Sequence, residues 1–329
     1  MSFWSGLTAE YSVEGLPHSS KQPRKPANEG TELKSCADVE TGIILRLDLQ
    51  EGKEAMIEKP YRCPPHSYGA GTACILRLTE PWHNSDRRII VVDGYFGSVE
   101  ALEACAKKGL SFIGAVKQAS KRFPKKFLQQ WYDNQDKENR GSFNFVSSTY
   151  HTNEEQMEMY AGCWQDTKPT MVVFNAGTEK EGSPSIRKRS YIETVNNERK
   201  TIKTEISVKR PKVIEEFYQG FSAIDVHDHS RQGTLGGERR WLTETWWHRL
   251  FCTVWGIILY DTYLAYSMVY QQRNHTYEGC QSFISFLGKL AHQMIFPQSQ
   301  NGSIMHIQVR KLNITLSILL QSINKLLLL

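Results

Sequence analysis

Three aspartates stand where an α/β protein could use them for phosphate chemistry. Asp38 and Asp93 each follow an apolar stretch typical of a strand, and Asp225 lies just before a helical region, with Asp228 one helical turn further on. Acids at the ends of strands face an open crevice and can share one site. Clustered carboxylates can hold two divalent cations about 3.5–4 Å apart, which clamp the attacking and leaving oxygens of a phosphodiester.

The segment around Asp93 is the most informative part of the sequence. Residues 89–92 are apolar and β-branched, and Asp93 follows them directly. Ser98 is a good N-cap for a helix over 99–108, and residues 110–116 predict a second strand. The segment therefore predicts a strand–helix–strand unit that presents an acid at a strand end. The alternative is an ordinary turn aspartate in such a unit.

The remaining patterns predict the fold. Paired strands are expected over 32–38 and 42–49, short strands between 120 and 210, and helices over 213–221 and 241–270. Two strand-borne acids and a late, helix-associated acid are the layout of an RNase H-like phosphoryl-transfer core. We predict an α/β fold with a mixed sheet, flanking helices, a strand-rich insertion and a helical C-terminal part. The predicted segments are a loop-rich N-terminal segment (1–30), the first part of the core (31–126), the insertion (127–210), the helical remainder of the core (211–297) and a low-complexity tail (298–329).

Composition narrows the class of protein. The chain has 329 residues, 40% of them hydrophobic and 23% charged, which is typical of a globular protein with one large or two modest domains. Its seven cysteines are scattered and form no C-x-x-C pair, so neither a zinc module nor a disulfide framework is predicted. The N-terminus shows no secretory signal, and we expect reduced thiols in an intracellular protein that is not secreted.

Basic residues gather in two stretches, although the net charge is only +5. Lysine and arginine placed in this way bind phosphates through counterion release, while a solvated surface is the alternative explanation. The candidates for phosphate contacts, which the family resemblance described below makes candidates for DNA contacts, are Lys117, Lys121, Arg122, Lys125, Lys126, Arg187, Lys188 and Arg189.

The tail differs from the rest of the chain. No acidic residue follows Glu278, and leucines and isoleucines between Leu312 and Leu327 form an amphipathic helical stripe. Interspersed polar residues argue against a membrane span. The tail is either a helix that docks on a partner or a read-through beyond the original reading frame.

Three blocks of the sequence resemble the catalytic domain of piggyBac-type transposases. Residues 37–42 are similar to that family's first acidic turn, and residues 91–98 to its most recognisable motif, an apolar strand, an aspartate, an aromatic residue and a serine. Residues 218–228 resemble the third block, in which a glycine-rich turn precedes two aspartates three positions apart. Residues 246–251 resemble the tryptophan- and arginine-containing helix that follows. The resemblance covers residues 3 to 297.

The resemblance implies a function and roles for the acids. Asp38, Asp93 and Asp225 would bind Mg²⁺ or Mn²⁺, with Asp228 as an accessory acid. The reaction would be hydrolytic nicking of transposon ends, followed by attack of the free 3′-hydroxyl. The partner would be DNA, the assembly a homodimer and the location the nucleus. Neither a membrane nor a small-molecule substrate is implied.

The departures from the family pattern support a second hypothesis. The third block carries Phe-Ser-Ala-Ile where the family has tighter glycine spacing, and His227 and His229 flank Asp228. An Asp/His metallohydrolase would need further histidines at ligand spacing. The family's N-terminal region and cysteine-rich tail, which engage transposon ends, are largely missing from this sequence. The alternative is therefore a catalytically idle or domesticated remnant that binds DNA non-specifically.

Overall fold

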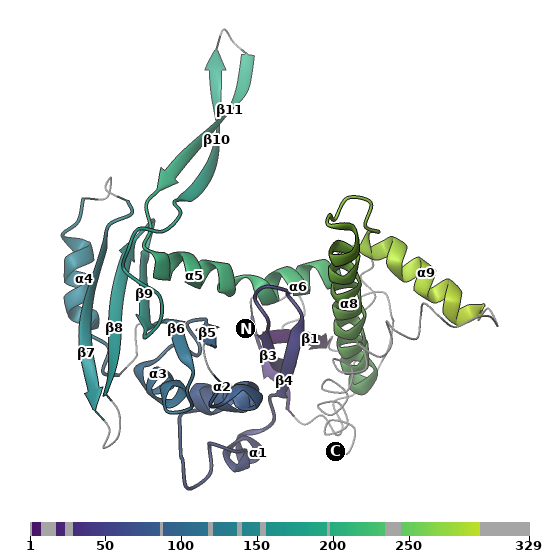
Figure 1. Cartoon of the computed structure of the whole chain (residues 1–329), viewed down its shortest axis with the longest axis horizontal. Coiled ribbons are helices and arrows are strands. Elements are labelled where there is room, and N and C mark those ends of the chain that lie inside the picture. Colours follow the sequence, from purple (N-terminus) through teal and green to yellow (C-terminus); the bar gives the residue numbers. More distant parts are fainter. Residues whose placement is uncertain are drawn as a thin grey trace. The chain divides into compact units, whose positions relative to one another are not determined.

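A computed structural model describes residues 2–7, 18–23, 29–85, 88–117, 121–136, 140–151, 156–195, 198–233 and 245–296 (Figure 1). The chain divides into two compact units, each described by itself. The first unit comprises residues Met1–Ser67 and Ser222–Leu329, and the second comprises Tyr68–Phe221. The predicted segment boundaries at residues 126 and 210 are not where this division falls, and they stay predictions.

The first unit is built around an antiparallel sheet. Strand β3 (Glu29–Ala37) pairs with β1 (Ser2–Leu7), β2 (Ser20–Lys21) and β4 (Ile44–Leu49). The segment predicted to be loop-rich therefore contributes β1 and β2, because β3 offers them backbone partners. The helices that the structure describes in this unit are α1 (Lys53–Glu58), α6 (Ala223–Gln232), α8 (Trp246–Asn274) and α9 (Phe283–Ile295).

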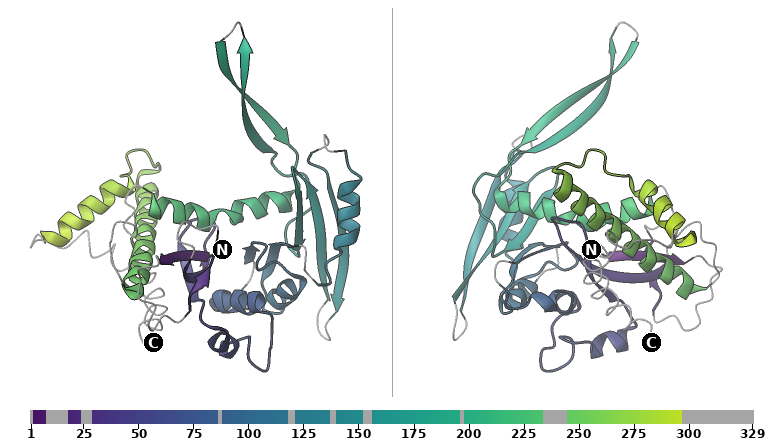
Figure 2. Two further views of the ribbon diagram at one scale, coloured as in Figure 1. Left: turned by 180° about the vertical axis from the view of Figure 1, so that it is seen from behind. Right: turned by 45° about the vertical axis from the view of Figure 1, so that its right-hand side comes forward.

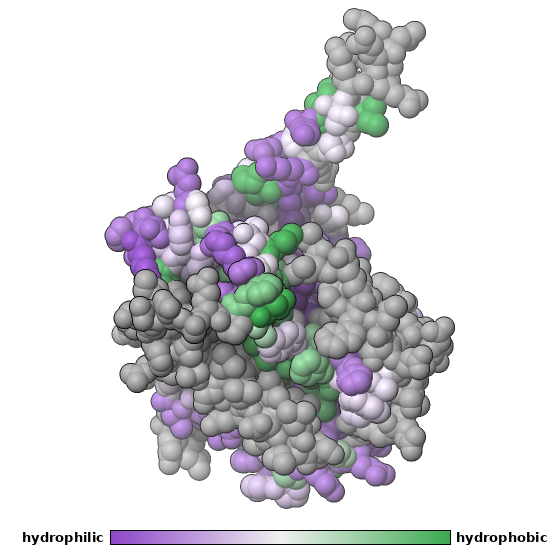
Figure 3. All heavy atoms as spheres, turned by 90° about the vertical axis from the view of Figure 1, so that its right-hand side faces the viewer, coloured by the Kyte–Doolittle hydropathy of each residue, from purple (hydrophilic) through white to green (hydrophobic). Residues whose placement is uncertain are grey.

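One hydrophobic cluster joins the sheet of the first unit to α6 and α8. Its buried members come from β3, β4, α6 and α8 and are Leu33, Ile44, Leu49, Ile224, Val254 and Ile257. The outer face of α8 is different, because Trp247, Phe251 and Trp255 are each at least 40% exposed. Figure 3 views the molecule from the side of α8 and α9, and hydrophobic side chains gather near the centre of this face.

The second unit contains a mixed five-stranded sheet in the order β5-β6-β9-β8-β7. Strands β5 (Ile89–Val92) and β6 (Ser111–Ala115) are parallel, and α3 (Val99–Ala106) connects them, as the sequence predicts. The other strands, β7 (Phe143–His151), β8 (Gln156–Gln165) and β9 (Pro169–Phe174), pair antiparallel. The other described helices of the unit are α2 (Ala70–Thr79), η1 (Glu80–Trp82), α4 (Lys125–Asp133) and α5 (Lys212–Phe221).

The core of the second unit contains strands β7–β9 and the side chain of Trp164. Strands β7–β9, which fall within the predicted insertion, extend the sheet of β5 and β6, and α5 packs against it around Ile113, Phe174 and Phe217. Trp164 is fully buried, and its indole N–H donates to the Lys209 carbonyl at 3.0 Å. This tryptophan therefore packs in the core.

Strands β10 (Ser185–Val195) and β11 (Glu198–Val208) form a separate two-stranded ribbon. Figure 2 shows the ribbon extending away from the five-stranded sheet of its own unit. Ile186 and Ile192, which share one face by register, are 53% and 68% exposed. The ribbon is thus a protruding arm with a mixed apolar and basic surface.

The predicted mixed α/β fold with a helical C-terminal part is confirmed, with corrections to individual elements. The sequence patterns did not predict helix α4, strand β8 or helix α9. The tail at 298–329 lies outside the described residues. Among the described residues, no helix is long and apolar enough to cross a membrane.

The cysteines give a testable consequence of burial. All seven are free thiols, and burial raises the pKa of Cys105 and Cys163 to about 12. Only thiolates react with disulfide reagents. At pH 8, we expect the half-buried Cys63 and Cys280 to be labelled well before Cys105 and Cys163. Peptide mass spectrometry after timed labelling measures this order, and equal rates would contradict the packing of α3 and β8.

Candidate functional site

Asp93 lies in a tight turn directly after β5. Its Oδ1 accepts the Tyr95 N–H at 2.9 Å, and its backbone carbonyl accepts the N–H groups of Phe96 and Gly97 at 3.1 and 2.9 Å. The Ser98 hydroxyl then accepts the Ala101 N–H at 3.1 Å and caps α3, as predicted. The half-buried Asp93 carboxylate is therefore held at the end of the parallel strand, with Oδ2 accepting no hydrogen bond from the described residues.

Glycines let the backbone around Asp93 pack closely. A Cβ atom on Gly97 would lie 1.7 Å from the Ala115 carbonyl oxygen of β6. A Cβ atom on Gly220 would lie 2.8 Å from the Cβ of Val91. Gly220 is thus a packing contact inside α5. No glycine-rich turn precedes Asp225, since Ser222 alone separates α5 from α6, which agrees with the departure of this block from the family pattern.

Lys117 follows β6 and lies beside the Asp93 turn. Its Cγ and Cε would be 3.0 and 3.1 Å from a Cβ atom on Gly94, so the aliphatic stem runs along the turn. The side chain of Lys117 is exposed. The second unit therefore places a carboxylate and a lysine next to each other at the same end of two parallel strands.

Asp38 lies in a second turn, directly after β3. Its Oδ2 accepts the Thr41 N–H at 2.8 Å, and its own N–H donates to the Ile43 carbonyl at 2.9 Å. Gly42 has a φ of 73°, a backbone conformation that glycine adopts at little cost. The Oδ1 atom of Asp38 accepts no hydrogen bond from the described residues, and the side chain is half-buried.

Asp225 and Asp228 lie inside α6, and not before a helix as the sequence suggested. Asp225 is in the first turn and is exposed. Asp228 Oδ1 accepts from Gln232 at 3.1 Å and forms an ion pair with Arg231, which is 4% exposed. Burial lowers the pKa of Arg231, while Asp228 counteracts this shift. Asp228 is therefore tied to its own helix, whereas Asp225 points to solvent.

Asp38 and Asp225 of the first unit each follow a residue that packs in the same hydrophobic cluster. Ala37, which precedes Asp38, packs against the cluster that contains Ile224, which precedes Asp225. Helix α6 also contacts β3 directly. Asp93 belongs to the second unit, so the convergence of all three carboxylates stays a prediction. Among the described residues, no group of three or more His, Cys, Asp or Glu side chains is placed to hold a metal ion.

The basic candidates divide by whether a carboxylate already neutralises them. Arg122 makes two hydrogen bonds to Glu103, at 2.7 and 3.0 Å, and Arg187 pairs with Asp166 at 2.7 Å. Lys188 lies 3.7 Å from Glu205, and both side chains are largely exposed, so this pair is weak. Lys117, Lys121, Lys125 and Lys126 form no ion pair with the described residues. The side chain of Arg189 lies outside the described set.

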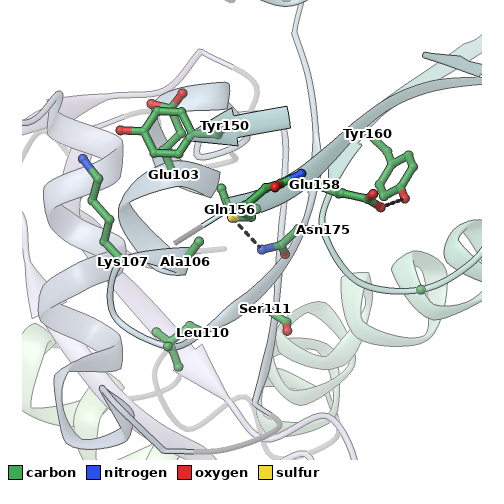
Figure 4. A pocket seen from close by; sticks show the side chains of 13 residues that line it. Glu103, Ala106, Lys107, Leu110, Ser111, Tyr150, Gln156, Glu158, Tyr160 and Asn175 are labelled. Carbon is green, nitrogen blue, oxygen red and sulfur yellow. Dashed lines mark hydrogen bonds between the residues drawn. The ribbon is translucent and has the colours of Figure 1, made fainter. Parts of the chain in front are cut away.

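A polar cavity of about 570 Å³ opens elsewhere in the second unit. Figure 4 shows residues that line this cavity, among them Glu103 of α3, Lys107 directly after α3, Tyr150 of β7, Glu158 of β8 and Asn175 directly after β9. Lys107 lies 5.6 Å from the centre of the Tyr150 ring. None of the predicted acids lines it, so this cavity is separate from the candidate site.

Sequence reasoning missed a buried pair behind the acids of the first unit. His227 Nε2 lies 3.0 Å from Asp261 Oδ1, and their side chains are 1% and 4% exposed. Burial raises the pKa of Asp261, and the hydrogen bond from His227 counteracts this shift. An aspartate in the middle of the apolar segment of α8 was the available signal, because buried carboxylates need partners.

The chain thus combines a mixed α/β fold with aspartates directly after two strands and in the first turn of a helix. Among solved structures, the chain is similar to a cryo-EM structure of a piggyBac transposase synaptic complex with hairpin DNA, with a TM-score of 0.62 and 13% sequence identity. The match covers 96% of this chain and 56% of that chain, so this chain spans little more than half of that protein. At this identity the likeness shows the fold.

The family assignment rests on the sequence. The family model described as Transposase IS4 matches residues 15–263, most of the chain, and the chain belongs to this family. The expected piggyBac-type relationship is thereby confirmed by the family model and by the fold. A comparison with curated proteins found no match.

Proposed function

We propose that this chain is a transposase-derived catalytic core that cleaves and transfers DNA strands by a two-metal mechanism. The observation that carries the proposal is the Asp93 turn. A carboxylate at the end of a parallel strand, with an exposed lysine beside it, stands in a chain that belongs to a transposase family. Such a turn offers both a ligand for a cation and a positive charge for the DNA backbone.

The donor set fits Mg²⁺ or Mn²⁺. In Asp38 and in Asp93, one carboxylate oxygen accepts a backbone N–H within the turn, and the other oxygen accepts no hydrogen bond from the described residues. The exposed Asp225 carboxylate also accepts no hydrogen bond from these residues. Hard carboxylate oxygens are the ligands that both cations prefer. The three aspartates would hold the cations, which when bound would activate the attacking oxygen and stabilise the leaving oxygen.

The remaining residues would position the acids and the DNA. The Thr41 and Tyr95 N–H groups orient the Asp38 and Asp93 carboxylates. Asp228, paired with Arg231, would act as an accessory acid mainly by fixing α6. The exposed lysines near Asp93 and on the ribbon would contact DNA phosphates. A homodimer and a nuclear location are part of the proposal by analogy with the family.

Salt dependence tests the predicted DNA contacts. We expect the double variant Lys126→Ala/Lys188→Ala to bind duplex DNA more weakly, with a slope of log K against log salt reduced by about 2, because each phosphate contact contributes about 0.9. Fluorescence anisotropy at several salt concentrations measures the slope. The control is Lys53→Ala/Lys289→Ala, which removes the same charge from exposed positions of the first unit. Equal slopes for the two double variants would refute site-specific contacts.

A catalytically idle remnant is the second candidate. It is favoured by the departure of the third block from the family pattern, since Gly220 lies inside α5 and Ser222 alone precedes α6. Both candidates predict salt-sensitive DNA binding, but only the first predicts nicking of supercoiled plasmid that depends on Mg²⁺ and stops with EDTA. DNA binding without nicking in either Mg²⁺ or Mn²⁺ would select the remnant.

A further inference from the structure

One buried carboxylate oxygen joins three elements of the first unit. Asp261 Oδ1, on α8, lies 3.0 Å from Nε2 of His227 on α6 and accepts the N–H of Ile44, the first residue of β4, at 3.1 Å. The His227 ring also packs edge-on against Tyr260, with the centroids 4.8 Å apart. The interaction therefore links α8, α6 and β4 through one atom.

Both partners of this oxygen are neighbours of predicted metal ligands. Ile44 follows Ile43, whose carbonyl accepts the Asp38 N–H at 2.9 Å and closes the Asp38 turn. His227 lies two residues after Asp225 on the same helix and one before Asp228. A shift of Asp261 would consequently move the Asp38 turn and the start of α6 together.

Stability alone is a poor explanation for this arrangement. The elements concerned already pack through an apolar cluster that includes Ile44, Ile224 and Ile257. Burying a carboxylate is costly, and apolar residues of similar size often serve folding equally well or better than a buried polar pair. Apolar packing is non-directional, however, whereas hydrogen bonds to one atom fix register and orientation.

We propose that Asp261 is a positioning residue that sets the Asp38 turn and the Asp225 helix relative to each other for cation binding. The inference rests on the proposed function, because it assigns a role in the same metal site. Asp261 would not touch DNA or metal. Its effect would pass through Ile44 and His227.

The experiment compares three variants of the full chain. Asp261→Ala removes the shared oxygen, Asp261→Asn keeps an acceptor oxygen for the Ile44 N–H, and Val254→Ala is a matched control that removes packing from the same helix and cluster. Mn²⁺ affinity is measured from the loss of the free-ion electron paramagnetic resonance signal. Thermal unfolding and Mg²⁺-dependent plasmid nicking are measured on the same samples.

We expect Asp261→Ala to weaken Mn²⁺ binding by about 10- to 100-fold, as outer-shell changes at metal sites do. Asp261→Asn should recover most of that loss, and Val254→Ala should bind Mn²⁺ like the original chain despite a lower Tm. If Asp261→Ala does not fold at the assay temperature, His227→Phe/Asp261→Leu replaces both members by apolar groups and carries the same comparison.

The outcomes separate the two proposals. An original chain that neither binds Mn²⁺ nor nicks DNA overturns the proposed function, and the positioning role with it. If the original chain binds Mn²⁺ and Asp261→Ala binds it with the same affinity as Val254→Ala, the positioning role alone is overturned.

Discussion

Asp93→Ala is expected to abolish Mg²⁺-dependent nicking while leaving the protein folded. The variant removes a carboxylate that the proposed mechanism uses to hold the cations. Removing one group that stabilises transition-state charge lowers the rate of an enzyme by about 10²–10³-fold. Because a metal ligand supports the whole site, we expect its loss to lower the nicking rate at least as much. The folded state loses one hydrogen bond, from the Tyr95 N–H, which contributes about 0.5–1.5 kcal/mol. Initial rates of plasmid nicking and circular dichroism of the same sample measure the two effects.

Two further variants make the Asp93 result specific. Asp93→Asn keeps the shape and the acceptor for Tyr95 but removes the charge, and it should be as inactive as Asp93→Ala. Asp133→Ala removes an exposed aspartate from the end of α4 in the same unit and should keep full activity. Undiminished nicking by purified Asp93→Ala would mean that the catalytic role of Asp93 is misassigned.

Gly97→Ala is expected to have the largest effect on stability. Its new methyl group would lie 1.7 Å from the Ala115 carbonyl oxygen and 2.7 Å from the Ala115 carbonyl carbon. Both are backbone atoms of β6, so no flexible side chain can move aside. The turn after Asp93 would have to separate from the sheet. We expect a loss of about 3 kcal/mol or more, a decrease in Tm of roughly 6–12 °C, measured by differential scanning calorimetry.

Gly288→Ala is the matched control for this substitution. Gly288 lies in α9, and a Cβ atom there would meet nothing within 4 Å. Alanine has the better helix propensity by about 0.8–1 kcal/mol, so this variant should be slightly more stable than the original chain. A Gly97→Ala variant that unfolds at the same temperature as Gly288→Ala would contradict the described contact between the Asp93 turn and β6.

The strand–helix–strand unit around Asp93 could be predicted because its signals are local. An apolar β-branched run, a serine cap and a terminating glycine each act within a few residues, and β5, α3 and β6 appear where these signals place them. The placement of Asp38 after a strand is local in the same sense. The family relationship could also be predicted, because it resides in short blocks of sequence that need no knowledge of packing.

Tertiary structure decided three other features: β7–β9 join the β5–β6 sheet, Gly220 packs against Val91, and Trp164 is buried. Each depends on partners far away in the chain, and no local period encodes them. The same holds for Asp261, whose carboxylate meets Ile44 across 217 positions. The sequence by itself determined which acids stand at element ends, since turns and caps are local. Tertiary structure decided which side chains hold those elements in place, because burial and hydrogen bonding between distant segments exist only in the folded chain.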